Sequence, residues 1–164
     1  RGKTPYVLDR FDLEYIRQFD FVHSGNYCFM EKELPKIHEA GVPISFDFSD
    51  DSEDSYYAEV APTVDYAFCS FDGTDEEARE HLKKIVLYDG QEYYVQKAVP
   101  IKEVVDTMGA GDSLITSFMV AYTDHLKKGI TGETAIRESL AAAAEFASKV
   151  CGMNGAFGYG KKYE

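Results

Sequence analysis

Short apolar runs alternate with segments of helical periodicity in the first half of the chain, and this alternation most limits how the chain can fold. We expect strands over three of the runs, Phe19–Ser24, Val42–Phe48 and Asp65–Ser70. A helix closed by Gly41 separates the first two, and a capping box of Thr74 and Glu77 opens another helix, which runs through about Ile85. This spacing predicts an α/β fold with a doubly wound, mostly parallel sheet flanked by helices.

The last third of the chain is expected to be helical. One apolar stripe recurs at helical spacing: Leu114, Ile115, Phe118, Met119 and Tyr122. A second helix, about Glu133–Cys151, carries small and apolar residues on one side: Ile136, Leu140, Ala143, Ala147 and Val150. With 45% apolar residues in 164, the chain is large enough for one domain with a buried core.

Charge and cysteine content narrow the expected partners and location. A formal charge of -12 opposes binding to nucleic acid or to an anionic membrane, so a small-molecule or protein partner is expected. The three cysteines lie far apart without a CxxC, which indicates neither a zinc site nor a disulfide framework and fits a reducing cytoplasm. No apolar run approaches the roughly 18 residues of a membrane span. Because the chain starts at Arg1 without methionine, we expect it to begin inside a larger protein.

A glycine-rich turn precedes the first of the two C-terminal helices. "VVDTMGAGDS" places Gly109, Ala110 and Gly111 at the helix start, followed by Asp112. Small residues let the backbone approach a ligand, and the N–H groups of a helix N-terminus favour anions, phosphate above all. An aspartate there repels phosphate, but it suits a base that takes a proton from a hydroxyl attacking phosphorus. The turn therefore predicts phosphoryl transfer.

The residues alone leave a second interpretation of this turn. Asp112 can be an ordinary helix N-cap, with the glycines making the turn and no ligand bound. Known phosphate-binding motifs do not decide between the two, because the sequence contains neither GxxxxGK[ST] nor GxGxxG. Both interpretations stay open on these grounds.

The segment "DTMGAGDS" is similar to DTxGAGD, the signature near the C-terminus of the ribokinase-like (PfkB) carbohydrate kinases. Further segments resemble the fructoselysine 6-kinase branch of that family: "FDFVHSG", "GVPISFDFSD", "VDYAFCS" and "GAFGYG". The resemblance implies ATP-dependent phosphorylation of a sugar hydroxyl, with O6 of fructoselysine or another fructosamine as first choice. Two alternatives are a kinase for another sugar, such as ribose, a ketohexose or a keto-deoxy acid, and a non-catalytic nucleotide-binding module.

The resemblance also implies roles for residues of the glycine turn. Asp112 is the expected general base, and the N–H groups of Gly109, Ala110, Gly111 and Asp112 are expected to form the anion hole for the transferred phosphoryl group. Gly109 and Gly111 then also count among the residues that contact the nucleotide.

Further residues match family positions beside the nucleotide. Asp106 and Thr107 match positions that lie next to it and, in some relatives, next to a monovalent cation. Gly155 and Ala156 match the segment that closes over the nucleotide. ATP and Mg²⁺ are the implied cofactors, the metal being held largely by phosphates and water. A homodimer is left open.

This sequence departs from the family pattern at two places. Where relatives carry Asn-x-x-Glu it has Ser70 to Gly73, so the metal ligands are unknown, with Asp47 or Asp72 able to supply a carboxylate. Relatives also carry T-x-G-x-x-G between a helix and a strand that here adjoin at Ile85 and Val86 without a turn. We therefore expect residues 1–164 to be the C-terminal nucleotide-binding part of a kinase domain, with an internal gap between 85 and 86.

Two other features suggest sites less specifically. The acidic run from Asp47 to Asp54 lacks the glycine and closing glutamate of a calcium loop, so we expect an acidic solvated loop. His23, at the end of the first expected strand, either borders a substrate pocket or is satisfied by local hydrogen bonds, and the second is expected.

Overall fold

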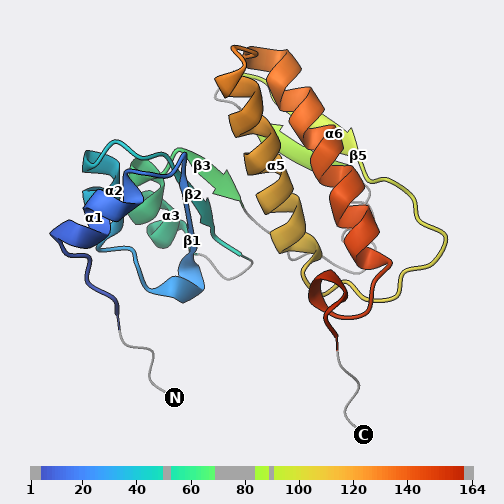
Figure 1. Ribbon diagram of the computed structural model, residues 1–164, viewed down its shortest axis with the longest axis horizontal. Coiled ribbons are helices and arrows are strands. Elements are labelled where there is room, and N and C mark those ends of the chain that lie inside the picture. Colours follow the sequence, from blue (N-terminus) through green and yellow to red (C-terminus); the bar gives the residue numbers. More distant parts are fainter. Residues whose placement is uncertain (1–4, 50–52, 69–83, 89–90, 161–164) are drawn as a thin grey trace, which may run out of the picture. The chain divides into compact units, whose positions relative to one another are not determined.

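A computed structural model describes residues 5–49, 53–68, 84–88 and 91–160 (Figure 1). The chain divides into two compact units, Arg1–Asp72 and Gly73–Glu164. Each unit has its own sheet and helices, and each is described by itself below.

The first unit contains a parallel sheet with the strand order β1-β2-β3 (Figure 1). Its strands are β1 (Val22–Gly25), β2 (Ile44–Asp47) and β3 (Tyr66–Phe68). Its helices are α1 (Arg10–Ile16), α2 (Leu34–Glu39) and α3 (Asp54–Val60), and short 3-10 turns follow β1 at Asn26–Cys28 and α3 at Ala61–Thr63. Helix α2 connects β1 to β2 and α3 connects β2 to β3, which is the strand–helix alternation of a parallel sheet.

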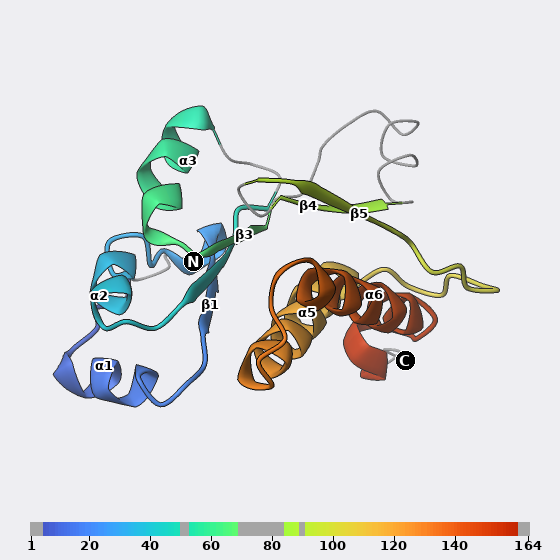
Figure 2. The same ribbon diagram turned by 90° about the horizontal axis from the view of Figure 1, so that it is seen from above.

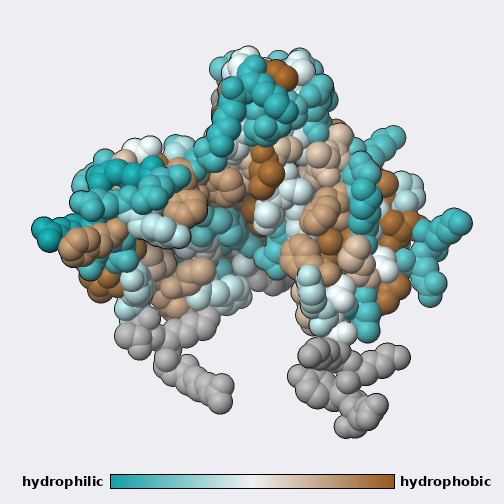
Figure 3. Space-filling model, viewed as in Figure 1, coloured by the Kyte–Doolittle hydropathy of each residue, from teal (hydrophilic) through white to brown (hydrophobic). Residues whose placement is uncertain are grey.

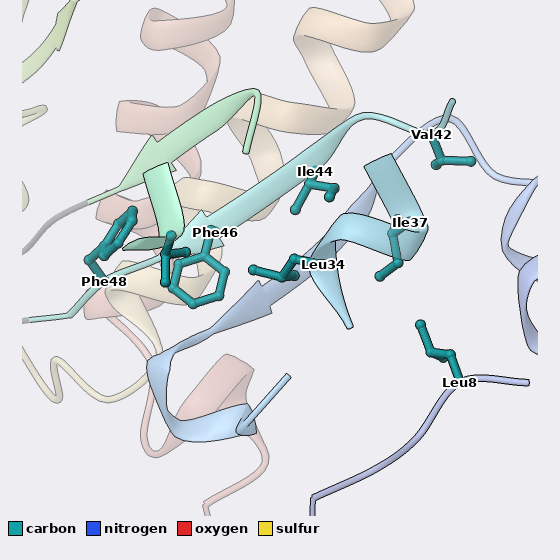
Figure 4. Close-up of a cluster of buried hydrophobic side chains, with 8 residues drawn as sticks. Leu8, Leu34, Ile37, Val42, Ile44, Phe46 and Phe48 are labelled. Atoms are coloured by element: carbon teal, nitrogen blue, oxygen red, sulfur yellow. The ribbon is translucent and has the colours of Figure 1, made fainter. Parts of the chain in front are cut away.

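Helix α2 and strand β2 form the centre of the first unit's core (Figure 4). Leu34 and Ile37, one helical turn apart on α2, are buried against Ile44 and Phe46 of the central strand. Phe48, just beyond the strand, stacks on Tyr57 of α3 with ring centroids 4.6 Å apart. Apolar side chains of α2 and α3 therefore attach these two helices to the sheet.

The three expected strands are confirmed. Strands β1 and β2 are shorter than expected, β3 begins one residue later, and the last two residues of the third expected strand, 69–70, lie outside the described ranges. Pro35 lies in the first turn of α2, where its missing N–H costs no hydrogen bond. Helices α1 and α3 were not expected. Asp54 begins α3 instead of lying in a solvated acidic loop, so that expectation is wrong for Asp54, while residues 50–52 lie outside the described ranges.

The second unit pairs a strand hairpin with two long helices (Figure 2). Strands β4 (Lys84–Tyr88) and β5 (Tyr93–Lys97) are antiparallel, with Val86 opposite Val95. Helices α5 (Ala110–Lys127) and α6 (Gly132–Cys151) confirm the two expected helices, and a 3-10 turn (Ala156–Gly158) follows them. Small buried residues on α5 and α6, including Ser113, Ala135, Ser139 and Ala143, permit close packing between them.

The predicted C-terminal end of the helix near Ile85 is wrong. Lys84 and Ile85 belong to β4, and the ladder with β5 runs from Lys84 to Tyr88 through the Ile85–Val86 bond. The start of that helix, including its capping box, lies outside the described residues. The internal gap between 85 and 86 stays a prediction.

Polar and apolar side chains intermingle on the face shown in Figure 3. The largest exposed apolar side chains of the first unit include Phe11, Tyr15 and Phe19, in or just after α1. Among the helices that the structure describes, none has the length and apolar character that crossing a lipid bilayer demands.

Candidate functional site

The N-terminus of α5 is capped by a glycine in a left-handed conformation. Gly109 has φ 79° and ψ 5°, and the helix begins at Ala110 without a side-chain cap. The Ala110 N–H bonds the Thr107 carbonyl at 3.1 Å, and the Ser113 N–H bonds the Gly109 carbonyl at 2.9 Å. Between them, the N–H groups of Gly111 and Asp112 find no acceptor among the described residues. Two donors at the positive end of the helix dipole are therefore open.

Asp112 is the third residue of this helix and its side chain is exposed. The N-cap position belongs to Gly109, so the interpretation of Asp112 as an N-cap is wrong. Its carboxylate has no hydrogen bond or ion pair within the part of the chain that is described, although it sits at the first turn of an 18-residue helix. The structure thus leaves a carboxylate and open N–H groups at the same turn.

The Asp106 carboxylate accepts hydrogen bonds from the glycine turn and from the loop after α6. Its Oδ1 accepts the Met108 N–H at 2.9 Å, and its Oδ2 accepts the Gly155 N–H at 3.0 Å. These bonds, first that from Met108 and then those from Gly155 and Thr107, lower the pKa of the Asp106 carboxyl below its ordinary value. The carboxylate is therefore the favoured form.

The loop after α6 packs closely on the glycine turn. A Cβ atom on Gly109 would lie 3.2 Å from the Cβ of Ala156, so the two backbones approach more closely than most side chains allow. Gly155 has φ 69°, and a Cβ there would lie 2.4 Å from the Cα of Gly160. Both glycines are required by their conformation and by the space around them.

The residues singled out in the sequence lie in the glycine turn and in the loop after α6 that packs on it. Asp106 bonds Gly155, and Gly109 contacts Ala156. Thr107 is exposed and contributes its backbone carbonyl to the turn, while Asp112 faces solvent.

Sequence reasoning missed several partners of this turn, and all of them act through the backbone. The carbonyl of Cys151 accepts the N–H groups of Val105 and Asp106, at 2.9 and 3.2 Å. Gly160 donates to the Asn154 carbonyl at 3.0 Å, which closes the loop around Gly155. A backbone acceptor leaves no signal in residue type, so only the positive φ of Gly155 was open to inference.

Other candidate residues lie outside this turn. His23 bonds the Ser45 hydroxyl through Nδ1 at 2.9 Å across the β1–β2 pair, which confirms the local hydrogen-bond interpretation. Asp47 ends β2 and its Oδ1 accepts the Ser49 N–H at 2.8 Å, while Asp72 lies outside the described ranges. Among the residues that are described, no three His, Cys, Asp or Glu side chains gather in a way that could hold a metal ion.

Comparison with known proteins agrees with the geometry of the turn. Residues 83–157 match the pfkB family carbohydrate kinase. The chain is 36% identical to fructosamine kinase FrlD of Bacillus subtilis, covering 93% of this chain and 56% of that protein. It is 31% identical to fructoselysine 6-kinase of Escherichia coli, covering 87% of this chain and 59% of that protein. The chain therefore spans little more than half the length of these curated relatives.

Solved structures support the fold at lower identity. A probable sugar kinase of Rhizobium etli CFN 42 matches with a TM-score of 0.65 at 19% identity, over 88% of this chain and 52% of that one. Ribokinase from Giardia lamblia matches with a TM-score of 0.60 at 16% identity, over 86% and 56%. These likenesses confirm the expected ribokinase-like α/β fold. Residues 83–157 thus carry a pfkB carbohydrate kinase domain match, and over most of its sequence this chain is similar to relatives of that kind.

Proposed function

We propose that this chain is the C-terminal, nucleotide-binding part of a kinase that transfers the γ-phosphoryl group of ATP to a sugar hydroxyl. One observation carries the proposal: at one helix turn, the N–H groups of Gly111 and Asp112 and the exposed Asp112 carboxylate all lack a hydrogen-bond partner among the residues that the structure describes. Helix α6 also begins without a side-chain cap, but the acidic residue of its first turn, Glu133, bonds Arg137, whereas the Asp112 side chain bonds nothing within the described residues.

The proposed substrate is a fructosamine, with fructoselysine as first choice and O6 as the acceptor. Two relatives named fructosamine kinase and fructoselysine 6-kinase support this choice. A kinase for another sugar, such as ribose, a ketohexose or a keto-deoxy acid, is the alternative substrate class.

The proposed reaction assigns one task to each part of the turn. Asp112 accepts the proton of the sugar hydroxyl while the hydroxyl oxygen forms a bond to the γ-phosphorus of ATP. The bond between the γ-phosphorus and the oxygen that bridges it to the β-phosphorus breaks, which releases ADP. The N–H groups of Gly109, Gly111 and Asp112 stabilise negative charge on the transferred group, whereas the Ala110 N–H, which was expected to join them, bonds the Thr107 carbonyl. Asp106, Thr107, Gly155 and Ala156 lie on the nucleotide side of the turn in this proposal.

The residues present fit phosphates better than they fit a dedicated metal cage. Open N–H groups at a helix N-terminus suit the phosphates of ATP. Mg²⁺ is proposed to be held by those phosphates and by water. A monovalent cation beside Asp106 fits less well, since both oxygens of that carboxylate already accept backbone N–H groups. Assembly as a homodimer is a further proposal.

The test uses the full-length protein in two assays. A coupled assay measures ADP release with ATP and Mg²⁺ over fructoselysine, other fructosamines, ribose, fructose and a keto-deoxy acid. Calorimetry measures ATP binding in parallel. Turnover that is fastest with fructoselysine supports the proposal, and faster turnover with another sugar reassigns the substrate. ATP binding without turnover on any sugar indicates a non-catalytic nucleotide-binding module and overturns the proposal.

A further inference from the structure

Asp106 connects two segments that lie 49 residues apart in the sequence. Its two carboxylate oxygens serve different segments: Oδ1 accepts the Met108 N–H inside the glycine turn, and Oδ2 accepts the Gly155 N–H in the loop after α6. Each oxygen thus fixes one backbone donor. A bond to an ionised acceptor is stronger than one between neutral groups, so this carboxylate can hold both segments in one geometry.

Contacts with the end of α6 and with the loop after it also restrain the glycine turn. The Cys151 carbonyl accepts the Val105 and Asp106 N–H groups, which anchors the approach to the turn at the C-terminal end of α6. Ala156 contacts Gly109 on the other side, closely enough that a Cβ on the glycine would stand 3.2 Å away. Asp106 is the side chain that connects the anchored approach to the contacting loop.

We propose that Asp106 is a positioning residue that sets the direction of the N–H groups at the start of α5, acting through Met108 and Gly155. Sequence comparison alone suggested that it lies beside the nucleotide or a cation. The structure instead engages both of its oxygens inside the protein. The kinetic part of this inference rests on the proposed function, whereas the structural part stands without it.

If Asp106 acts through two accepted hydrogen bonds, substitutions that remove one or both of them should differ in effect. Asparagine has one oxygen and one NH₂ group, so in either orientation it places a donor against a backbone donor and keeps only one of the two bonds. Alanine keeps neither. Loss of function should therefore follow the order alanine, then asparagine, then wild type.

Amide hydrogen exchange, followed by mass spectrometry on the full-length protein, tests the structural part. In the wild type, the amides of Met108 and Gly155 should exchange slowly, and overlapping peptides separate them from the other bonded amides nearby. In Asp106→Ala these amides should exchange at least about ten-fold faster, because their acceptor is gone. Asp124→Asn is the matched control: it removes the same charge from α5, where Asp124 pairs only with Lys128 on the surface, and it should leave both amides unchanged.

Kinetics test whether the positions of these segments matter for the reaction. In Asp106→Ala, kcat should fall by about ten-fold to 100-fold, since small displacements of catalytic groups have effects of this size. The KM for the sugar should stay within about two-fold, because uniform substrate binding is untouched. A direct nucleotide ligand would show the reverse pattern, a raised KM for ATP with kcat retained.

The outcomes separate this inference from the proposed function. Fast exchange of the Gly155 amide in the wild type, or unchanged exchange in Asp106→Ala, overturns the inference whatever the activity. A wild-type protein with no kinase activity overturns the proposed function and leaves the exchange result to decide the inference. If Asp106→Ala does not fold, Asp106→Asn replaces it, and there the loss of one slow amide supports the inference while the retention of both overturns it.

Discussion

Helices α1 and α5 both have an aspartate as their third residue, yet their N-termini are built in different ways. In α1, Asp9 is the N-cap and accepts the N–H groups of Phe11 and Asp12, while the Asp12 side chain accepts the Asp9 N–H. In α5, the cap is Gly109, and Asp112 bonds no backbone donor within the described residues. One helix end satisfies its own donors, and the other leaves them open.

This difference bears on the proposal that the start of α5 binds a ligand. A reciprocal capping box uses up the donors and the acidic side chain, so α1 has nothing left to offer a ligand. A glycine in the left-handed region ends the preceding turn without supplying a side-chain acceptor, so α5 keeps its donors. A similar acidic pattern therefore caps the helix in α1, whereas in α5 the carboxylate takes no part in a cap.

The largest expected effect is on activity, from Asp112→Asn. Turnover by the full-length enzyme should fall about 100-fold to 10,000-fold, the usual contribution of a general base, while ATP affinity changes little. Steady-state kinetics and calorimetry measure the two quantities. Turnover close to the wild-type rate would show that Asp112 is not the base.

The two glycines of the turn should respond differently to alanine. Gly109→Ala forces a side chain into φ 79° and against Ala156, so it should lower the free energy of unfolding by about 1–3 kcal/mol. Gly111 has ordinary φ and open space around its Cβ position, so Gly111→Ala should leave stability unchanged or raise it by up to about 1 kcal/mol.

Measurements of kcat distinguish the two glycine variants further. If a phosphate approaches the backbone at Gly111, Gly111→Ala should lower kcat even though the protein is as stable as the wild type. Urea unfolding and steady-state kinetics on both variants supply the comparison. Full activity in Gly111→Ala would argue against close approach of a ligand at that residue.

Removal of the Asp9 cap tests whether the N-terminus of α1 has only a structural role. Asp9→Ala should lower stability by about 0.5–2 kcal/mol, the usual cost of losing an N-cap, and should leave kcat and KM unchanged. Urea unfolding measures the first and the coupled assay the second. A large loss of activity in a folded Asp9→Ala protein would contradict the separation between a structural and a functional helix end.

The smallest effect is expected from Asp12→Asn, the same substitution as in Asp112→Asn at the same position of a helix. The asparagine oxygen can still accept the Asp9 N–H, so stability should change by no more than about 0.5 kcal/mol and activity not at all. Equal loss of activity in Asp12→Asn and Asp112→Asn would remove the distinction between the two helix ends.

The sequence predicted the parallel strands because each is a short apolar run, and it misplaced their ends because the ends depend on partners. Pro43, just before β2, has no N–H to donate, but its carbonyl accepts the Val22 N–H at 2.9 Å. The hydrogen bonding between the two strands therefore extends one residue before the start of β2. Helix α1 escaped prediction because it is short and carries apolar residues on more than one side: Leu13 and Ile16 pack against the core, while Phe11 and Tyr15 are exposed. Strand β5 is partly polar, and only its pairing with β4 reveals it.

The site was predictable where it depends on residue type and not where it depends on the backbone. Glycines at 109 and 155 both have positive φ, which explains why that residue type marks the turn and the loop. The carbonyl of Cys151 is a bond partner that any residue could supply, so no pattern points to it. The pairing of Asp106 with Gly155 requires the chain to fold before the two can meet.

The bond between Asp106 and Gly155 also has a consequence for how the protein is made. A nascent chain presents the glycine turn 49 residues before it presents the loop that fixes it. Until that later segment has been synthesised, the turn lacks its Cys151 and Gly155 partners, and its N–H groups have no set direction. Binding of an anion at this turn should therefore appear late in synthesis, after α6 has formed.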